Sequence, residues 1–347
     1  MEFLFDYGLF LAKAATIVIA IVVVAGSIAS LALRHRKAEP EIQLTLLNRQ
    51  YEDMESAIRG ASLGPGGQKQ WMKAEKKKAK QKSKEEKKSA KEGKDSSRPR
   101  IFVLDFDGDI RASATEAMRN EISAILTSAA PKDEVLLRLE SGGGLVHSYG
   151  LAASQLQRLR DHDISLTIAV DKVAASGGYM MACVANHIIA APFSIIGSIG
   201  VLAQIPNLHR FLKKHEVDFE QLSAGEFKRT LTLFGENTEK GREKMQQELE
   251  ETHQLFKDFI AARRPGLDLS AVATGEHWLG TRALELGLVD ALSTSDDYLM
   301  NARNDHDLIK VEYSRRKNLQ ERIGVMFYRV GSNRRQEIRD LESPLLM

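Results

Sequence analysis

The chain has 347 residues, of which 43% are hydrophobic, so it has enough apolar material for a large folded domain and is not intrinsically disordered. The formal net charge is only +2 and one lysine-rich block carries much of the positive charge, so charge gives no reason to expect a nucleic-acid partner. The single cysteine, Cys183, excludes an intramolecular disulfide framework.

The first predicted element is a membrane anchor in residues 1–37. Residues 7–33 are almost all apolar, and about 20 such residues suffice for a helix to cross a bilayer. A cleavable signal peptide is the alternative, but the apolar stretch is long for one and its basic residues follow it instead of preceding it. These basic residues, at 34–37, favour a cytoplasmic location for the bulk of the chain by the positive-inside rule.

Residues 38–100 are predicted to connect this anchor to the folded domain. Residues 42–58 have helical spacing, glycine and proline at 60–67 interrupt it, and lysine dominates 69–94. The lysine-rich stretch cannot bury enough apolar surface to fold alone, so it is predicted to be a tether. Adhesion of its lysines to anionic lipid is the alternative.

From residue 101 the sequence alternates strands with helices, which is typical of an α/β fold with largely parallel sheets. The predicted strands are 101–106, 134–139, 165–170, 187–191, 195–205 and 217–222. The predicted helices are 115–129, 145–160, 179–185, 207–216 and a long charged helix at 238–264. We assign residues 101–312 to one domain and residues 313–347 to a basic C-terminal extension.

Ser176 is the candidate nucleophile, because it lies where the strand at 165–170 gives way to the helix beginning at Tyr179. Small residues surround it, from Ala174 to Gly178, and leave its hydroxyl accessible. The first N–H groups of a helix also favour a developing negative charge. The alternative is that Ser176 merely caps a buried helix.

A serine nucleophile needs a base, and Lys228 is the best candidate. Five histidines are candidates, but none lies in a recognisable catalytic motif: His147, His162, His187, His209 and His215. A lysine acts as a base only when burial favours its neutral amine. Lowering the lysine pKa from about 10.4 to about 7 in this way costs about 4.6 kcal/mol. Lys228 has apolar neighbours such as Phe227, whereas Lys172 follows Asp171 and is expected to stay charged. The alternative for Lys228 is an ordinary surface lysine.

A second set of backbone donors is predicted in the glycine loop, Ser141–Gly144. This loop follows the strand at 134–139 and opens a helix, and glycines in such a position let N–H groups face an anion. The loop and Ser176 are separated by one strand and one helix, which favours their meeting at one edge of a parallel sheet.

Together these segments resemble the signal peptide peptidase A family of serine peptidases (S49). The resemblance rests on the glycine loop, on Val-Ala-Ala-Ser-Gly-Gly-Tyr at 173–179, on Ile-Gly-Ser-Ile-Gly-Val at 196–201 and on Lys228, and it covers roughly 101–308. It implies a Clp-protease and crotonase type of fold, a spiral of ββα units. One difference is Gly142, which stands where relatives commonly have proline.

The resemblance also implies roles for individual residues. Ser176 would be the nucleophile of a serine endopeptidase and Lys228 its general base, while Gly143 and Gly177 would supply the N–H groups of the oxyanion hole. No metal or cofactor would be needed. A crotonase-like acyl-CoA enzyme and a non-catalytic membrane scaffold remain as alternatives.

Substrates, assembly and location follow from the same resemblance. The implied substrates are signal peptides left in the membrane and other short or unfolded polypeptides. The implied assembly is a homo-oligomeric ring, with an octamer as one candidate, whose subunits can share an active site. The expected location is a bacterial inner membrane, crossed once by residues 7–33. The family favours a periplasmic catalytic domain, in conflict with the charges at 34–37, so the side stays open.

Overall fold

The computed structural model describes residues 7–10, 13–22, 24, 40–63, 67, 71, 73–74, 77 and 98–315. The chain divides into two units, Ile42–Glu312 and a second formed by Met1–Glu41 with Tyr313–Met347. Most of the predicted tether, most of the C-terminal extension and part of the predicted span at 7–33 lie outside the described residues. Within the described part of the chain, no helix is both long enough and apolar enough to cross a membrane.

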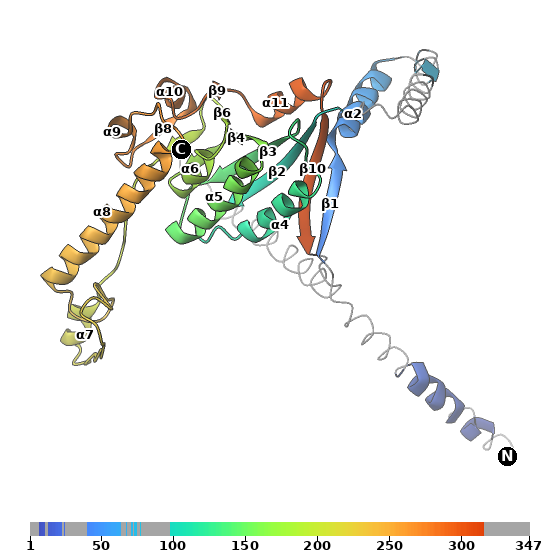
Figure 1. Ribbon diagram of the computed structural model, residues 1–347. Coiled ribbons are helices and arrows are strands. Elements are labelled where there is room, and N and C mark those ends of the chain that lie inside the picture. The colour runs from blue at the N-terminus through green and yellow to red at the C-terminus, as the bar shows by residue number, and fades with distance from the viewer. Residues whose placement is uncertain are drawn as a thin grey trace, which may run out of the picture. The chain divides into compact units, whose positions relative to one another are not determined.

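The described strands form one sheet of ten, and its main path has the order β1-β10-β2-β3-β4-β6-β9 (Figure 1). Pairing is parallel from β10 through β2, β3, β4 and β6 to β9. The strands are β1 (Pro40–Leu46), β2 (Arg100–Gly108), β3 (Glu134–Ser141), β4 (Ser165–Val170), β5 (Val173–Ala175), β6 (His187–Ala190), β7 (Ile195–Gly197), β8 (His277–Leu279), β9 (Ala291–Leu292) and β10 (Asp307–Arg315). The predicted α/β class is therefore confirmed.

A short branch leaves this main path beside the candidate site. Strand β5 pairs with β3 and with β7, both in parallel, and β7 pairs with β8 in antiparallel orientation. Ala174 lies opposite Ser141 in this branch, so the end of β3 and the residues before Ser176 are side by side. The branch thus brings the glycine loop to the candidate nucleophile.

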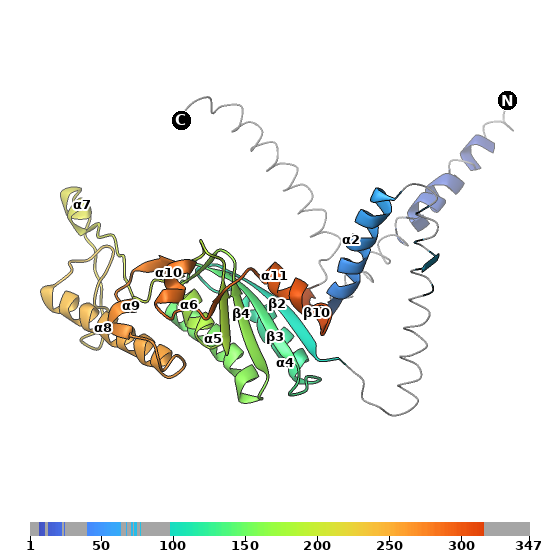
Figure 2. The same ribbon diagram turned by 90° about the horizontal axis from the view of Figure 1, so that it is seen from above.

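Helices cover both faces of the sheet, because its central strands are apolar on both faces (Figure 2). In β2, Phe102 and Leu104 belong to the core beneath α4 and α5, and Ile101 and Val103 to the core beneath α2 and α11. The helices are α2 (Leu47–Ser62), α4 (Thr115–Leu126), α5 (Val146–Asp161), α6 (Gly177–Ala182), α7 (His209–Lys214), α8 (Glu239–Ala261), α9 (Leu269–Val272), α10 (Gly280–Glu285) and α11 (Ser295–Ala302).

The helix predicted at 42–58 begins later than expected. Residues Pro40–Leu46 form β1, in which apolar and polar residues alternate with the period of a strand. Helix α2 follows, and Leu47 and Tyr51 on it pack against the smaller core cluster. The Asn48 side chain donates to the carbonyl oxygens of Arg303 and His306, both at 2.9 Å. Residues 40–62 are therefore joined to the sheet.

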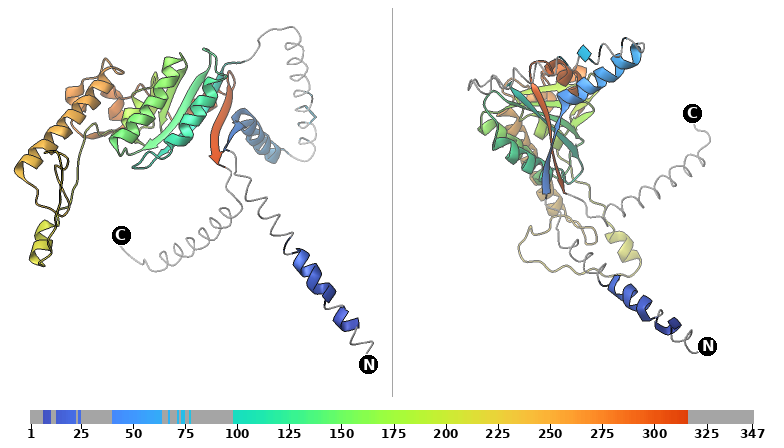
Figure 3. Two further views of the ribbon diagram at one scale, coloured as in Figure 1. Left: turned by 60° about the horizontal axis from the view of Figure 1, so that its bottom comes forward. Right: turned by 90° about the vertical axis from the view of Figure 1, so that its right-hand side faces the viewer.

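The segment 200–238 also differs from the prediction. The strand expected at 195–205 ends at Gly197, because Gly197 (φ 101°) and Ser198 (φ 51°) turn the chain out of extended geometry. The prediction of a strand at 217–222 is wrong, since these residues have no strand structure. The helix expected at 207–216 is present as the shorter α7. Figures 1 and 3 show this segment beside the N-terminal half of α8 and away from the sheet.

Candidate active site

Ser176 occupies a strained position between β5 and α6. Its φ of 53° and ψ of −117° lie where residues other than glycine are rare, and such a conformation costs about 1–3 kcal/mol. Two backbone hydrogen bonds hold it there: the Ser176 N–H donates to the Gly197 carbonyl at 2.7 Å, and the Ser176 carbonyl accepts from the Met180 N–H at 3.0 Å. A strained residue maintained by its surroundings is a candidate for function.

The residues around Ser176 are more buried than the serine itself. Ala174 and Ala175 before it and Gly177 and Gly178 after it are all buried, while Ser176 is half-buried. Ser176 therefore offers the accessible hydroxyl of this junction, as the small neighbouring residues predicted. Gly177 is the first residue of α6, so its N–H has no acceptor within that helix.

The glycine loop comes within contact distance of this junction through Gly143. A Cβ built on Gly143 would lie 2.6 Å from the Gly177 nitrogen and 2.8 Å from the Ser176 Cβ. Its φ of +87° is a second reason why only glycine fits. The structure thus brings together Gly143, Ser176 and Gly177, three of the four residues that the sequence proposed for the site.

The Gly143 N–H already has an acceptor, because it donates to the Ser141 hydroxyl oxygen at 3.1 Å. An oxyanion at Ser176 would have to share or take this N–H. A full negative charge can compete for it, since hydrogen bonds to charged acceptors are roughly twice as strong as those between neutral groups.

Lys228 lies apart from these three residues. It belongs to the segment 200–238, its side chain is exposed, and its N–H donates to the Gly225 carbonyl at 3.2 Å. Among the described residues, the Lys228 amine forms no hydrogen bond or ion pair, and none joins it to Ser176. Within one chain, the structure does not bring the predicted base to the predicted nucleophile.

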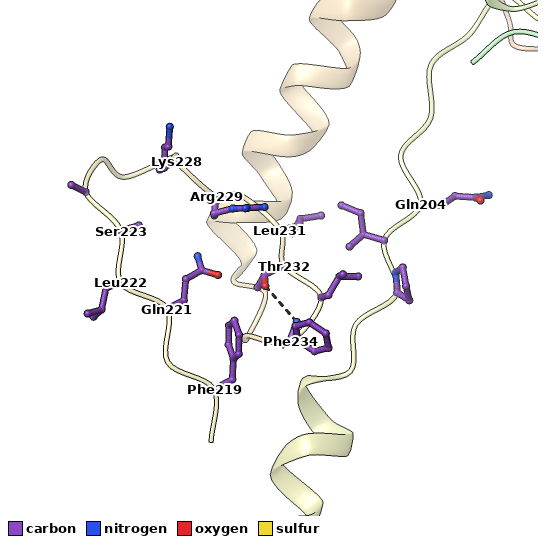
Figure 4. Close-up of a pocket in the computed structure, with 14 residues that line it drawn as sticks. Gln204, Phe219, Gln221, Leu222, Ser223, Lys228, Arg229, Leu231, Thr232 and Phe234 are labelled. Atoms are coloured by element: carbon purple, nitrogen blue, oxygen red, sulfur yellow. Dashed lines mark hydrogen bonds between the residues drawn. The ribbon is translucent and has the colours of Figure 1, made fainter. Parts of the chain in front are cut away.

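Lys228 instead borders a cavity of about 810 Å³ whose lining is part polar and part apolar. The cavity is lined by side chains of the segment 200–238, including Phe219, Leu222, Leu231 and Phe234. Figure 4 shows Lys228 at the end of its loop, pointing away from the Phe219 and Phe234 rings. The same segment leaves large apolar side chains in water, of which Leu222 is 96% exposed. An apolar surface of this kind is typical of a protein interface.

The other candidate bases have different partners. The Lys172 amine pairs with the Glu140 carboxylate at 2.8 Å, and this hydrogen bond raises the pKa of Lys172, so Lys172 stays charged as the sequence predicted. The His162 ring bonds to the Arg158 carbonyl and the His187 ring faces Asp290 at 3.8 Å. No group of three or more metal-ligating side chains meets among the described residues.

Sequence reasoning missed two residues of this site, Ser141 as a side chain and Tyr149. The sequence marks Ser141 only as the start of the glycine loop, and Tyr149 falls within the predicted helix at 145–160. Both prove to lie directly behind the loop, where the hydroxyls of Ser141 and Tyr149 are 2.6 Å apart. Periodicity marks Tyr149 as buried and carries no signal for its hydroxyl.

A serine with a strained backbone, placed beside a helix N-terminus and a glycine loop in a largely parallel sheet, is typical of a serine hydrolase. Residues 2–156 match the family described as Peptidase family S49 N-terminal, and residues 158–309 match Peptidase family S49. The chain belongs to peptidase family S49 and is a serine peptidase. The resemblance drawn from the motifs is confirmed at this level.

Two curated relatives agree with this assignment. A protein named Probable protease SohB from Haemophilus influenzae is 52% identical over 326 residues, covering 93% of this chain and 92% of that protein. Another protein of the same name, from Buchnera aphidicola subsp. Schlechtendalia chinensis, is 49% identical over 304 residues, covering 87% of this chain and 100% of that protein. A solved structure of the 1510-N membrane-bound stomatin-specific protease is 14% identical with a TM-score of 0.40, covering 59% of this chain and 84% of that one.

Proposed function

We propose that this peptidase is a membrane-anchored endopeptidase with a Ser/Lys dyad, in which Ser176 is the nucleophile and Lys228 the general base. Gly143 and Gly177 supply the oxyanion N–H groups, and residues 7–33 are the anchor. The substrates are signal peptides or other short or unfolded polypeptides. The observation that carries this proposal is the approach of Gly143 to within contact distance of Ser176 and the Gly177 amide.

The reaction is acyl transfer to Ser176 and then to water. The neutral Lys228 amine takes the proton of the Ser176 hydroxyl while the oxygen attacks the peptide carbonyl carbon. The carbonyl oxygen becomes an oxyanion held by the two glycine N–H groups. Lys228 returns the proton to the departing amine nitrogen as the peptide bond breaks. Water, deprotonated by Lys228, then hydrolyses the ester and restores the Ser176 hydroxyl.

The base would reach the nucleophile across a subunit boundary. Three observations support this geometry: Lys228 is exposed, its amine has no partner among the described residues, and the segment that carries it presents apolar side chains to water. A neighbouring subunit on this surface would cover those side chains. It would also remove Lys228 from water, which favours the neutral amine that a base requires. A homo-oligomer follows from this arrangement, and we propose that it is a ring.

Two consecutive strand pairs support the proposed spiral of ββα units. Strands β4 and β6 belong to the main path of the sheet, whereas β5 and β7, which follow each of them, belong to the branch. Helix α6 completes the unit begun by β4 and β5. The active site would lie at the point where one unit passes to the next.

Labelling and complementation test the dyad together. The full-length protein in detergent is treated with a fluorophosphonate, which should modify Ser176 in the wild type and leave Ser176→Ala unmodified. Ser176→Ala and Lys228→Ala should each lack peptidase activity, and co-expression of the two should restore part of it if the dyad is shared. Full activity in either single variant would contradict the proposal, whereas activity of neither the single variants nor the mixture would favour a dyad within one chain.

The membrane side is tested separately. The proposed location is a bacterial inner membrane, and the basic residues at 34–37 favour a cytoplasmic domain. A reporter enzyme active only in the periplasm, fused after residue 100, should then be inactive, whereas a cytoplasmic reporter at the same place should be active. The opposite pattern would place the domain in the periplasm.

A further inference from the structure

Behind the glycine loop lies a continuous chain of three hydrogen bonds. The Gly143 N–H donates to the Ser141 hydroxyl oxygen at 3.1 Å, the hydroxyls of Ser141 and Tyr149 are 2.6 Å apart, and the Tyr149 hydroxyl donates to the Asp109 carbonyl at 2.8 Å. Ser141 is 1% exposed and Tyr149 is 0% exposed. Water is therefore excluded from the two side chains that make the chain.

The direction of each hydrogen bond follows from the number of protons. Tyr149 has a single hydroxyl proton, and the Asp109 carbonyl, which can only accept, takes it. The proton between the two hydroxyls must then come from Ser141, which leaves the Ser141 oxygen to accept from the Gly143 N–H. Burial raises the pKa of Tyr149, so its hydroxyl remains a donor at neutral pH. The chain holds the Gly143 amide in one orientation, with its N–H on the Ser141 oxygen, and an oxyanion at Ser176 would share this N–H as a second acceptor.

Tyr149 and Ser141 also pack against the backbone at Gly177 and Gly178, where the other oxyanion donor lies. A Cβ on Gly177 would lie 2.4 Å from a ring carbon of Tyr149, so the Gly177 backbone rests directly on that ring. A Cβ on Gly178 would lie 2.5 Å from the Ser141 carbonyl oxygen. The Tyr149 ring thus fixes the position of the Gly177 amide, while its hydroxyl fixes Ser141 and, through it, the Gly143 amide.

We infer that Ser141 and Tyr149 are positioning residues of this peptidase, which set the two halves of the oxyanion hole relative to each other and to Ser176. This inference rests on the proposed function, because it assigns these residues a role in stabilising the oxyanion. Both side chains are buried, so neither is exposed to a substrate. Their effect passes through the backbone amides of Gly143 and Gly177.

Removal of the Tyr149 hydroxyl should lower kcat and leave KM nearly unchanged. Oxyanion donors act on charge that develops in the transition state, so their misplacement affects kcat more than substrate binding. Loss of one donor typically reduces turnover by about 10²–10³-fold. A donor that is loosened but still present should cost less, and we expect a decrease of about 10–100-fold for Tyr149→Phe.

Tyr179 offers a matched control. It is also 0% exposed, it lies on α6 three residues after Ser176, and its hydroxyl donates to the Leu288 carbonyl at 2.9 Å. Tyr149→Phe and Tyr179→Phe each remove one buried hydroxyl and leave one backbone carbonyl without its donor, but the Tyr149 hydroxyl also bonds to Ser141. Both variants should therefore lose stability, Tyr149→Phe the more of the two, and only Tyr149→Phe removes a hydrogen bond from the chain that leads to Gly143.

The experiment compares the full-length wild type, Tyr149→Phe, Tyr179→Phe and Ser141→Ala in detergent. It measures Tm, kcat and KM for a peptide, and the rate of Ser176 labelling by a fluorophosphonate, whose adduct places an oxygen in the oxyanion hole. We expect kcat and labelling to fall by similar factors in Tyr149→Phe and Ser141→Ala, with KM within about twofold of wild type. Tyr179→Phe should keep the wild-type kcat and labelling rate while its Tm falls.

Other outcomes overturn the inference. A wild-type kcat and labelling rate in Tyr149→Phe would exclude a positioning role. Losses of kcat and labelling rate in both Tyr149→Phe and Tyr179→Phe, in proportion to their losses of Tm, would exclude it too. If Tyr149→Phe fails to fold, Ser141→Ala answers the same question, since it removes the acceptor of the Gly143 N–H. A wild-type protein that neither cleaves peptides nor labels at Ser176 would instead refute the proposed function, and the inference with it.

Discussion

Gly143 and Ser176 meet so closely that a Cβ on the glycine would lie 2.8 Å from the Cβ of the serine. The two residues are far apart in sequence, and the pairing of Ser141 with Ala174 between β3 and β5 brings them together. This contact gives the glycine loop a defined place opposite the nucleophile. It also leaves no room for a side chain at position 143.

Gly143→Ala should abolish most activity. The new methyl group would collide with the Gly177 nitrogen at 2.6 Å, and the φ of +87° is unfavourable for alanine by about 1–2 kcal/mol. The loop must then move away from Ser176, and we expect kcat to fall by at least about 10²-fold. The matched control is Gly150→Ala on α5, where a Cβ meets no atom within 4 Å and the helix should gain about 0.5–1 kcal/mol. Wild-type peptidase activity in Gly143→Ala would contradict the predicted role of the loop.

Replacement of Ser176 should separate activity from stability. Both Ser176→Ala and Ser176→Gly remove the hydroxyl and should be inactive. The φ of 53° with ψ of −117° remains strained for alanine and is relaxed for glycine, so the glycine variant should be more stable than the alanine variant by about 1 kcal/mol. Urea denaturation of the two variants measures this difference. The opposite order of stability would indicate that the backbone at position 176 is not strained.

Leu222→Glu should prevent assembly and reduce activity. Leu222 is 96% exposed on the segment that carries Lys228, and a carboxylate buried there between subunits would oppose association. Ile58→Glu is the control, because Ile58 on α2 is also an exposed aliphatic residue, at 73%. Light scattering of the detergent-solubilised protein reports the assembly. An unchanged oligomer in Leu222→Glu would exclude Leu222 from the subunit interface.

The burial of Cys183 should make the enzyme insensitive to thiol reagents. Burial raises the pKa of the Cys183 thiol to about 12, so almost no thiolate exists at neutral pH. Iodoacetamide should therefore leave peptidase activity unchanged in the native protein and modify Cys183 only after denaturation. Rapid loss of activity with iodoacetamide would mean that the core around α6 opens in the native state.

The sequence predicted the parts of this site that depend on neighbours along the chain. The run of strand, small residues and helix identified Ser176, and the glycines after the strand at 134–139 identified the loop. The features that it missed depend on distant partners: Asn48 bonds to residues near the C-terminal end of the described chain, and the Tyr149 hydroxyl meets Ser141 only after folding. Lys228 was chosen for its apolar neighbours, and the structure shows those neighbours exposed within one chain.

Asp133 should make the domain sensitive to acid. Its carboxylate is buried and accepts hydrogen bonds from the Arg100 backbone and guanidinium, at 2.9 and 2.5 Å, and from the Ala130 N–H at 2.7 Å. Burial alone would raise the pKa of Asp133, but these bonds outweigh it and hold the pKa below the ordinary value of an aspartate. A carboxyl whose pKa is lowered in the folded state stabilises the fold at pH values above its pKa in the unfolded chain, which is about 3.9. This stabilisation is lost as the pH falls through its pKa in the folded state.

Asp133→Asn tests this relationship. It leaves Arg100 without its charged partner, so we expect a loss of about 3 kcal/mol at pH 7, near the lower end of the range for a broken buried pair because Arg100 is partly exposed. The difference from wild type should shrink as the pH falls below about 4 and through the lowered pKa of Asp133, where the folded wild-type carboxylate also loses its charge. Urea denaturation at neutral and acidic pH measures both values. A difference that stays constant with pH would show that the Asp133 charge does not contribute to stability.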